Sequence, residues 1–282
     1  MKTAFVIAGG GSLGAMQVGM LKALHARGVH ADVVAGVSVG SINAFFYASD
    51  PTTSGIERLE RVWLGIRRQD VFPAPGLRGL WRIMRGSDHF FDPAGLAGLL
   101  AATLPHRDFE ATARPCYVVA TDVLTGSAVT LQQGPVLPAL MASAAIPAVF
   151  PPVRVGDRLL NDGSLAYFAP FEAVVGAGAT RLYVLPTGYS CARRQAPTTA
   201  LSYALSALNQ LTAGKLIGSI RHFARDVDVQ VVPPLCPMSV SPLDFRHTAS
   251  LIRRAEEQTY DWLEHGTRMI DGLPHQMLPH FH

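Results

Sequence analysis

Cysteine, charge and regular repeats are scarce in this sequence of 282 residues, and each shortage excludes a class of protein. The three cysteines have no C-x-x-C spacing, so we expect neither a disulfide framework nor a zinc ribbon. Charged residues make up 16% of the chain and hydrophobic ones 49%, which excludes disorder and supplies a core. The net charge is only +3, and Lys and Arg form no dense cluster in the sequence, so we expect no nucleic-acid binding.

Two segments have some features of a signal peptide or of a transmembrane helix. The N-terminal apolar run is short and follows a single lysine, so it predicts a buried first strand and no cleaved signal peptide. Residues 123–153 contain no charge, but five prolines would break any helix there and two glutamines would leave polar groups in hydrocarbon. We therefore expect no transmembrane segment, and a cytoplasmic protein whose membrane contact, if it has one, is peripheral.

Apolar runs and helical stripes alternate along the chain, which favours an α/β fold. We expect strands at residues 3–8, 33–37, 116–121, 128–131, 181–185 and 227–232, and helices at 13–27, 41–48, 55–68, 77–84, 93–104, 200–223 and 246–265. This order predicts a three-layer α/β/α fold with a mostly parallel central sheet, whose site lies beyond the carboxyl ends of the strands. The tail from residue 272 is expected to fray.

The segment from Gly36 to Gly40 is a G-x-S-x-G motif between an expected strand and an expected helix. In this context a sharp turn lifts the serine hydroxyl out of the sheet, and a Cβ at either glycine would crowd that turn. The first amides of the helix favour negative charge nearby. Ser38 is therefore a candidate nucleophile, the alternative being that the glycines serve an ordinary tight turn.

A glycine-rich segment follows the first expected strand; it consists of Gly9, Gly10, Gly11, Ser12, Leu13 and Gly14. Its backbone N–H groups, next to a helix N-terminus, suit either a phosphate or the oxyanion of a tetrahedral intermediate. The glycines also match G-x-G-x-x-G, so dinucleotide binding is an alternative. That alternative needs an acidic residue at the end of the second strand, whereas Asp32 precedes that strand.

A third motif, from Asn161 to Ser164, contains Asp162 and Gly163. Taken alone, an Asp-Gly pair indicates a turn and gives the aspartate no special role.

In this order the three motifs resemble the patatin-like phospholipase family, which has a Gly-rich oxyanion loop, a G-x-S-x-G elbow and an Asp-Gly block bearing the catalytic aspartate. Ala120-Thr121-Asp122 and the segment from Ala142 to Pro152 look like further parts of that family. The resemblance covers about residues 3–190. It implies a patatin-like fold and a serine acyl hydrolase that acts on carboxylic esters of (phospho)lipids.

The resemblance also assigns roles to residues. It implies that Ser38 attacks the ester carbonyl while Asp162 accepts its proton, with no histidine between them. The amides of Gly9, Gly10, Gly11, Ser12, Leu13 and Gly14 would hold the oxyanion, Gly36 and Gly40 would form the elbow, and Gly163 and Ser164 would form the turn after the aspartate. No metal and no cofactor are implied, and the sequence has no H-E-x-x-H motif.

Two positions depart from the family pattern. Leu13 stands where the family often has Arg, and Phe168 where it commonly has Asn. These departures leave one alternative open, a catalytically idle lipid- or acyl-binding protein of the same fold. A Ser-His-Asp triad with His222 or His247 is another, although both histidines are expected in or beside helices.

The expected domain organisation is a catalytic core over residues 1–190, with a helical insertion at about 50–115, and a mostly helical extension over 191–282 packed on the same domain. From residue 57 to 85 seven arginines outnumber three acidic residues and alternate with aromatic and aliphatic side chains. We expect this part to cover the site and meet an anionic lipid surface. The alternative is ordinary packing on the core with the arginines in solvent. The sequence leaves the oligomeric state open.

Overall fold

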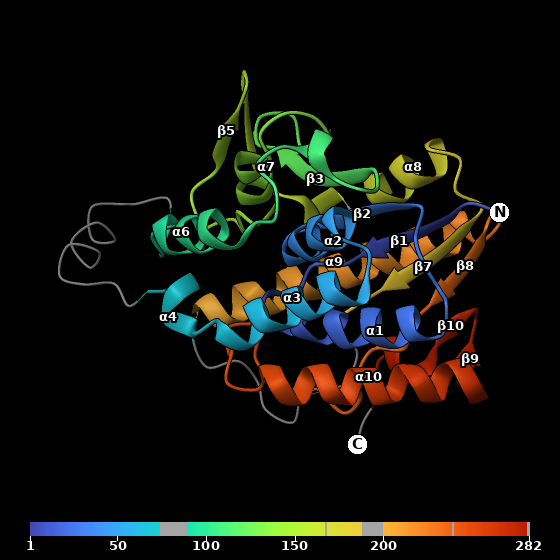
Figure 1. Ribbon diagram of the computed structural model, residues 1–282. Coiled ribbons are helices and arrows are strands. Elements are labelled where there is room, and N and C mark those ends of the chain that lie inside the picture. The colour runs from blue at the N-terminus through green and yellow to red at the C-terminus, as the bar shows by residue number, and fades with distance from the viewer. Residues whose placement is uncertain (74–88, 167, 188–199, 239, 281–282) are drawn as a thin grey trace.

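The computed structural model describes residues 1–73, 89–166, 168–187, 200–238 and 240–280 (Figure 1). A sheet of eight strands runs through this part, in the order β5-β6-β3-β2-β1-β7-β8 with β4 paired to β3. The strands are β1 (Thr3–Ile7), β2 (Val33–Val37), β3 (Cys116–Asp122), β4 (Ala128–Leu131), β5 (Val153–Val155), β6 (Arg158–Asp162), β7 (Arg181–Leu185) and β8 (Asp228–Val231). The pairings among β3, β2, β1, β7 and β8 are parallel, and those of β4, β5 and β6 are antiparallel.

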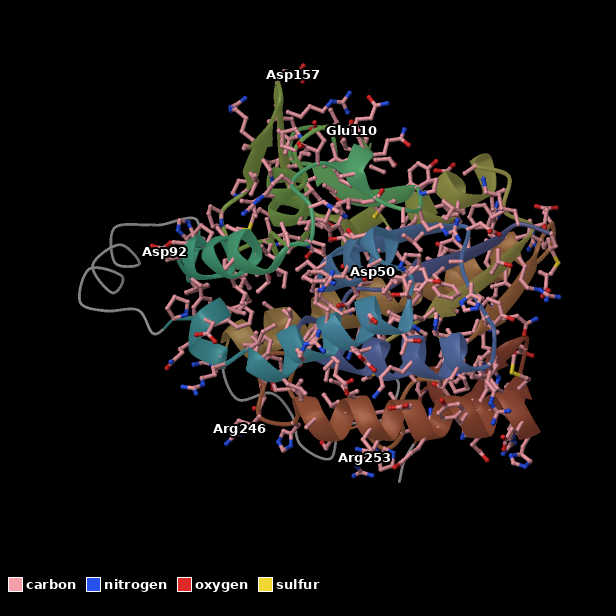
Figure 2. All side chains as sticks on the ribbon, in the orientation of Figure 1. Asp50, Asp92, Glu110, Asp157, Arg246 and Arg253 are labelled. Carbon is pink, nitrogen blue, oxygen red and sulfur yellow. The ribbon has the colours of Figure 1, made fainter. Side chains whose placement is uncertain are left out.

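Helices cover both faces of this sheet. They are α1 (Ala15–Ala26), α2 (Val39–Ser49), α3 (Thr53–Gly65), α4 (Arg68–Val71), α6 (Ala94–Thr103), α7 (Val136–Ser143), α8 (Phe168–Gly176), α9 (Ala200–Phe223) and α10 (Thr248–His265), with 3-10 turns η1 (Gly11–Gly14) and η3 (Gly163–Ala166) beside two of the strands. The expected three-layer fold with a mostly parallel sheet is confirmed. Most charged side chains lie at the periphery, as Glu110, Asp157 and Arg253 do in Figure 2.

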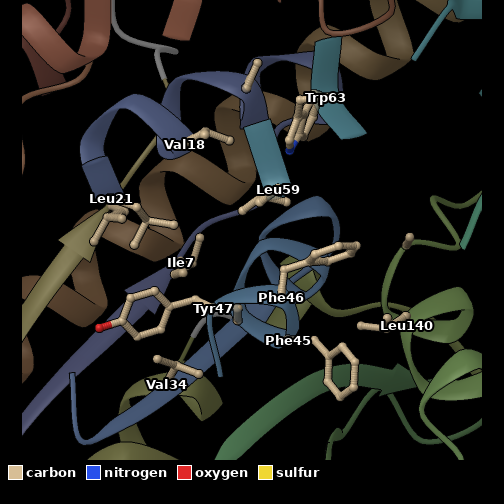
Figure 3. Close-up of a cluster of buried hydrophobic side chains, with 14 of the residues drawn as sticks. Ile7, Val18, Leu21, Val34, Phe45, Phe46, Tyr47, Leu59, Trp63 and Leu140 are labelled. Carbon is tan, nitrogen blue, oxygen red and sulfur yellow. The ribbon is translucent and has the colours of Figure 1, made fainter. Parts of the chain in front are cut away.

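The alternation of side chains along β1 produces the layers, because successive residues of a strand point to opposite faces. Phe5 and Ile7 belong to a core that includes α1, α2, α3 and α10. Ala4 and Val6 belong to a second core with α8 and α9. Figure 3 shows Ile7 and Tyr47 within the first core. Because both faces are buried, β1 is apolar at nearly every position, as the sequence indicated.

Two sequence expectations about the backbone are wrong. The prolines of residues 123–153 do not exclude a helix, because Pro138 lies in the first turn of α7, where a missing N–H costs no hydrogen bond. The tail is ordered rather than frayed over Leu273 and Met277, which are buried in the second core. The helix expected at 77–84 lies outside the described residues.

None of the helices that the structure describes combines the length and apolar character needed to span a bilayer.

The helices α1 and α10 lie side by side (Figure 1), and a glycine sets how closely they approach. A Cβ on Gly19 of α1 would lie 2.1 Å from the carbonyl oxygen of Ile252 in α10, which is far inside van der Waals contact. Gly19 therefore lets the backbones of the two helices touch.

We expect Gly19→Ala to lower the free energy of unfolding by about 1–3 kcal/mol, because overpacking outweighs the gain in helix propensity. Urea denaturation measures this change. Gly214→Ala is the matched control: a Cβ there meets no atom of the described residues within 4 Å, so the same substitution in α9 should stabilise the protein by about 0.5–1 kcal/mol. Equal effects of the two substitutions would contradict the close helix contact.

Candidate active site

Ser38 lies at the sharp turn between β2 and α2. Its backbone, with φ 52° and ψ −134°, is in a region that residues with side chains rarely adopt. The turn has no room for neighbouring side chains: a Cβ on Gly36 would lie 2.4 Å from the Gly40 oxygen, and one on Gly40 would lie 2.3 Å from the Ile7 oxygen. The glycines of the motif therefore leave space for the turn that presents Ser38 at the N-terminus of α2.

Ser143, the last residue of α7, fixes this turn to the sheet. Its Oγ accepts the N–H of Ser38 at 2.9 Å and donates to the carbonyl of Val119 in β3 at 2.6 Å. The hydroxyl of Ser41 donates to the Ser38 carbonyl at 2.6 Å. Sequence reasoning missed Ser143, although it lies within a segment that carried the family resemblance.

Asp162 ends β6 and is 3% exposed. Its backbone N–H donates to the carbonyl of Ala145, and its Oδ1 accepts the N–H of Ser164 at 2.8 Å. A Cβ on Gly163 would lie 1.9 Å from the carbonyl oxygen of Val119, so the chain after Asp162 passes directly over β3. The second oxygen, Oδ2, is buried and has no hydrogen-bond partner among the described residues.

The carboxyl of Asp162 and the hydroxyl of Ser38 are neighbours although they are far apart in the sequence. Burial raises the pKa of Asp162, while the N–H and hydroxyl of Ser164 and the hydroxyl of Ser38 oppose part of this rise. A carboxylate whose pKa is raised is a stronger base, which makes proton transfer from an adjacent hydroxyl easier.

The glycine-rich segment crosses the end of β1 and is bonded on both sides. The Gly9 carbonyl accepts the hydroxyl of Thr187 at 2.7 Å, and the N–H of Ser12 donates to the carbonyl of Pro242 at 2.8 Å. Within the described part of the chain the N–H groups of Gly10 and Gly11 have no acceptor. Leu13 is buried in the first core, which accounts for an apolar residue at this position.

A buried polar network supports both ends of the glycine-rich segment. Gln17 donates from Nε2 to the carbonyls of Ala8 and Leu185, and Asn43 donates from Nδ2 to the Gly14 carbonyl and to Gln17 Oε1. The indole N–H of Trp63 donates to Asn43 Oδ1 at 2.9 Å. The network thus joins α1, α2 and α3 to the segment. Sequence reasoning missed it, because polar residues inside amphipathic helices give no signal of such contacts.

An apolar pocket opens beside Ser38. It holds about 680 Å³ of empty space, its open mouth included. Gly11 and Ser38 lie in its wall, and nearly all other lining side chains are apolar. They come from α2 (Ile42, Phe46), from α3 and the residues after it (Leu59, Val62, Trp63, Ile66, Val71, Phe72), from α6 (Leu96, Leu99, Leu100), and from Ile146, Phe150 and Phe245. Figure 3 shows Phe46, Leu59 and Trp63 close together between α2 and α3.

The structure brings neither candidate histidine to Ser38. The ring of His222 contacts Phe168 and Phe223, and His247 lies beside Asp244, with 3.7 Å between Nε2 and Oδ2. Neither histidine lines the pocket. Asp32 accepts the N–H of Thr3 at the amino end of β1, so it lies at the opposite end of the strand from the glycine-rich segment. Among the described residues no His, Cys, Asp and Glu side chains gather in a group that could hold a metal.

Comparison with known proteins identifies the family. The profile described as patatin-like phospholipase matches residues 5–175, which is more than half of the chain. The matched range contains Ser38, Asp162 and the whole glycine-rich segment. The chain belongs to the patatin-like phospholipase family, which confirms the resemblance found from the motifs and supports a lipid hydrolase in general.

Curated relatives are longer than this chain. An uncharacterized NTE family protein of Mycobacterium tuberculosis is 27% identical over 178 residues, 63% of this chain and 47% of that protein. The human patatin-like phospholipase domain-containing protein 6 is 25% identical over 187 residues, 66% of this chain and 13% of that protein. The crystal structure of VipD from Legionella pneumophila aligns with 93% of this chain and 66% of its own, with 12% identity and a TM-score of 0.44.

The buried carboxyl of Asp162 predicts a pH-dependent stability. Because its pKa is raised in the folded state, Asp162 costs no stability at low pH, where it is protonated, and destabilises the fold once the pH rises through that pKa. We expect Asp162→Asn to raise the free energy of unfolding by about 1 kcal/mol at pH 8, since the variant no longer buries a negative charge whose Oδ2 has no partner among the described residues. The gain should disappear near pH 4. Thermal unfolding at both pH values measures it.

Asp122→Asn is the control with the opposite sign. The N–H groups of Thr125 and then Leu124 lower the pKa of Asp122, so its ionised form stabilises the fold. This variant should lose stability both at pH 8 and at pH 4, and the loss should shrink only when the pH falls below 4 and through the lowered pKa of Asp122. A destabilised Asp162→Asn at pH 8 would contradict the cost of burying this carboxylate in its ionised form.

Proposed function

We propose that this chain is a lipid acyl hydrolase that cleaves carboxylic esters of (phospho)lipids through Ser38 and Asp162, without a metal or cofactor. The observation that carries the proposal is the hydroxyl of Ser38 beside the buried carboxyl of Asp162, at the wall of an apolar pocket. Family membership supports the lipid substrate.

The chemistry would proceed in two halves. Ionised Asp162 accepts the proton of the Ser38 hydroxyl as Oγ attacks the ester carbonyl, and the alcohol leaves with that proton. Water then attacks the acyl-enzyme while Asp162 accepts its proton, and this proton passes to Ser38 Oγ as the bond to the acyl group breaks and the fatty acid is released. The N–H groups of Gly10 and Gly11 are suited to hold the oxyanion, because those of Ser12 and Leu13 already donate to Pro242 and Gly10.

The pocket supports an acyl chain as the group bound next to Ser38. Its lining is aliphatic and aromatic, so binding a hydrocarbon chain removes apolar surface from water at about 25 cal/mol per Å². A polar leaving group has no comparable partners among the lining residues. The ester is therefore expected to lie with its acyl chain in the pocket and its alcohol part toward the open mouth.

Labelling by a fluorophosphonate ester tests the pair of residues without a choice of substrate. We expect the native protein to be labelled at Ser38, no labelling of Ser38→Ala, and a rate for Asp162→Asn that is lower by a factor of about 100 or more, because the general base is lost.

The histidines supply the matched controls. His222→Ala and His247→Ala should react at the native rate, because neither ring reaches the pocket. Loss of labelling in one of them would favour a Ser-His-Asp triad instead. A folded native protein that is not labelled would favour the idle lipid- or acyl-binding protein.

The outer side of α3 suits contact with a membrane surface near the pocket. Leu59 and Trp63 on its inner side line the pocket, whereas Arg61 and Leu64 are exposed, the latter at 52%. Arg67 and Arg68 follow, also exposed. We propose that this basic and apolar side of the helix meets an anionic lipid surface, so that an ester can enter the pocket from the bilayer. The arginines expected further along, from residue 78 to 85, lie outside the described residues.

Vesicle sedimentation tests this contact. Each arginine near an anionic surface contributes about 1 kcal/mol, so Arg61→Glu, Arg67→Glu and Arg68→Glu together should weaken binding to phosphatidylglycerol-containing vesicles on the order of 100-fold. The control reverses three other exposed arginines, Arg158, Arg225 and Arg253, which gives the same net charge. Equal binding of the two triple variants would contradict a specific role for α3.

A further inference from the structure

The segment between β8 and α10 contacts the glycine-rich segment at Gly11, where there is no room for a side chain. A Cβ on Gly11, whose φ is +58°, would lie 2.5 Å from the carbonyl oxygen of Pro242. That carbonyl accepts the N–H of Ser12, and the hydroxyl of Ser12 donates to the neighbouring carbonyl of Ser241 at 3.0 Å. Ser12 is fully buried, so both of its donor groups are removed from bulk water.

A second contact fixes the other end of the glycine-rich segment. Thr187, which follows β7, donates its hydroxyl to the carbonyl of Gly9 at 2.7 Å, and its side chain is 3% exposed. Thr187, Ser241 and Pro242 all lie beyond residue 175, where the family match ends. The glycine-rich segment of the matched region is thus held from both sides by residues outside that region.

The residues around Pro242 are themselves fixed. Asp244 donates its N–H to the Ser241 carbonyl, and Thr248 at the start of α10 donates its hydroxyl to the Phe245 carbonyl at 2.8 Å. The ring of Phe245 lies 6.3 Å from that of Trp63 and lines the pocket. The helix that follows is packed against α1. The carbonyl groups that bind Ser12 therefore belong to a rigid support.

Glycines give the segment its open N–H groups, and they also make it the part of the site with the most backbone freedom. An oxyanion hole lowers the barrier because its donors are in place before charge develops, and a displacement of 1 Å costs about 100-fold in rate. From these contacts we infer that Ser12 and Thr187 are positioning residues, which hold Gly10 and Gly11 toward the reacting carbonyl by tying the glycine-rich segment to the C-terminal part of the chain. The inference rests on the proposed acyl hydrolase function.

Steady-state kinetics on a short-chain p-nitrophenyl ester test this role. We expect Ser12→Ala and Thr187→Val each to lower kcat about 10-fold with KM unchanged within about two-fold, because the transition state loses stabilisation while the acyl pocket is intact. Fluorophosphonate inactivation should slow in the same proportion, since it also develops an oxyanion. Thr187→Ser keeps the hydroxyl and should restore most of kcat.

The matched control variants remove buried hydroxyl hydrogen bonds that lie away from the glycine-rich segment. Ser219→Ala in α9 and Thr259→Val in α10 each delete a hydroxyl that donates to a helix carbonyl, Lys215 and Ala255 respectively, and should leave kcat unchanged. The inference is overturned if the Ser12 and Thr187 variants keep native kcat, if the control variants lose as much, or if KM rises while kcat does not fall. Should Ser12→Ala fail to fold, the Thr187 pair decides alone. A native protein with neither turnover nor labelling overturns the proposed function and this inference with it.

Discussion

The backbone of Ser38 is held in a left-handed conformation, which costs on the order of 1–3 kcal/mol for a residue with a side chain. Contacts with the surrounding residues offset this cost. Ser143 accepts its N–H, Ser41 donates to its carbonyl, and Gly36 and Gly40 leave the space that the turn requires. If any of these contacts were lost, the turn could relax and the hydroxyl would move away from the carboxyl of Asp162. Strain at one residue thus explains why several buried polar groups converge on it.

The strand β3 is the common support of both halves of the site. It lies between β2, which ends next to Ser38, and β6, which ends at Asp162. The carbonyl of Val119 accepts the hydroxyl of Ser143 and is also the atom that Gly163 passes over most closely. Because adjacent strands lie about 4.8 Å apart, two side chains from strands flanking a third can meet above it. The order of the strands, rather than any local motif, therefore brings the serine and the aspartate together.

Much of this arrangement could be predicted from the sequence, and what could not has identifiable physical reasons. Near-continuous apolar runs predicted β2, β4 and β7 to the residue, and the G-x-S-x-G context placed Ser38 at the end of β2. The helix α7 was missed because Pro138 looks like a helix breaker unless its place in the first turn is known. The contacts of Ser12 with Pro242 and of Gln17 with Leu185 join residues far apart along the chain. No periodicity or spacing encodes such pairs, since they depend on how completed elements pack.

The partners of the glycine-rich segment are also far away in the order of synthesis. The hydroxyl bonds at Gly9 and Ser12 join residues separated by 178 and 229 positions. Ser38 and Asp162 are synthesised before Ser241 and Pro242, so the nascent chain contains the serine and the aspartate before it contains the support for the glycine-rich segment. An unfinished or C-terminally trimmed chain would hold its serine in an incompletely formed site. The support for the glycine-rich segment is therefore complete only after the segment between β8 and α10 has been synthesised and has packed against it.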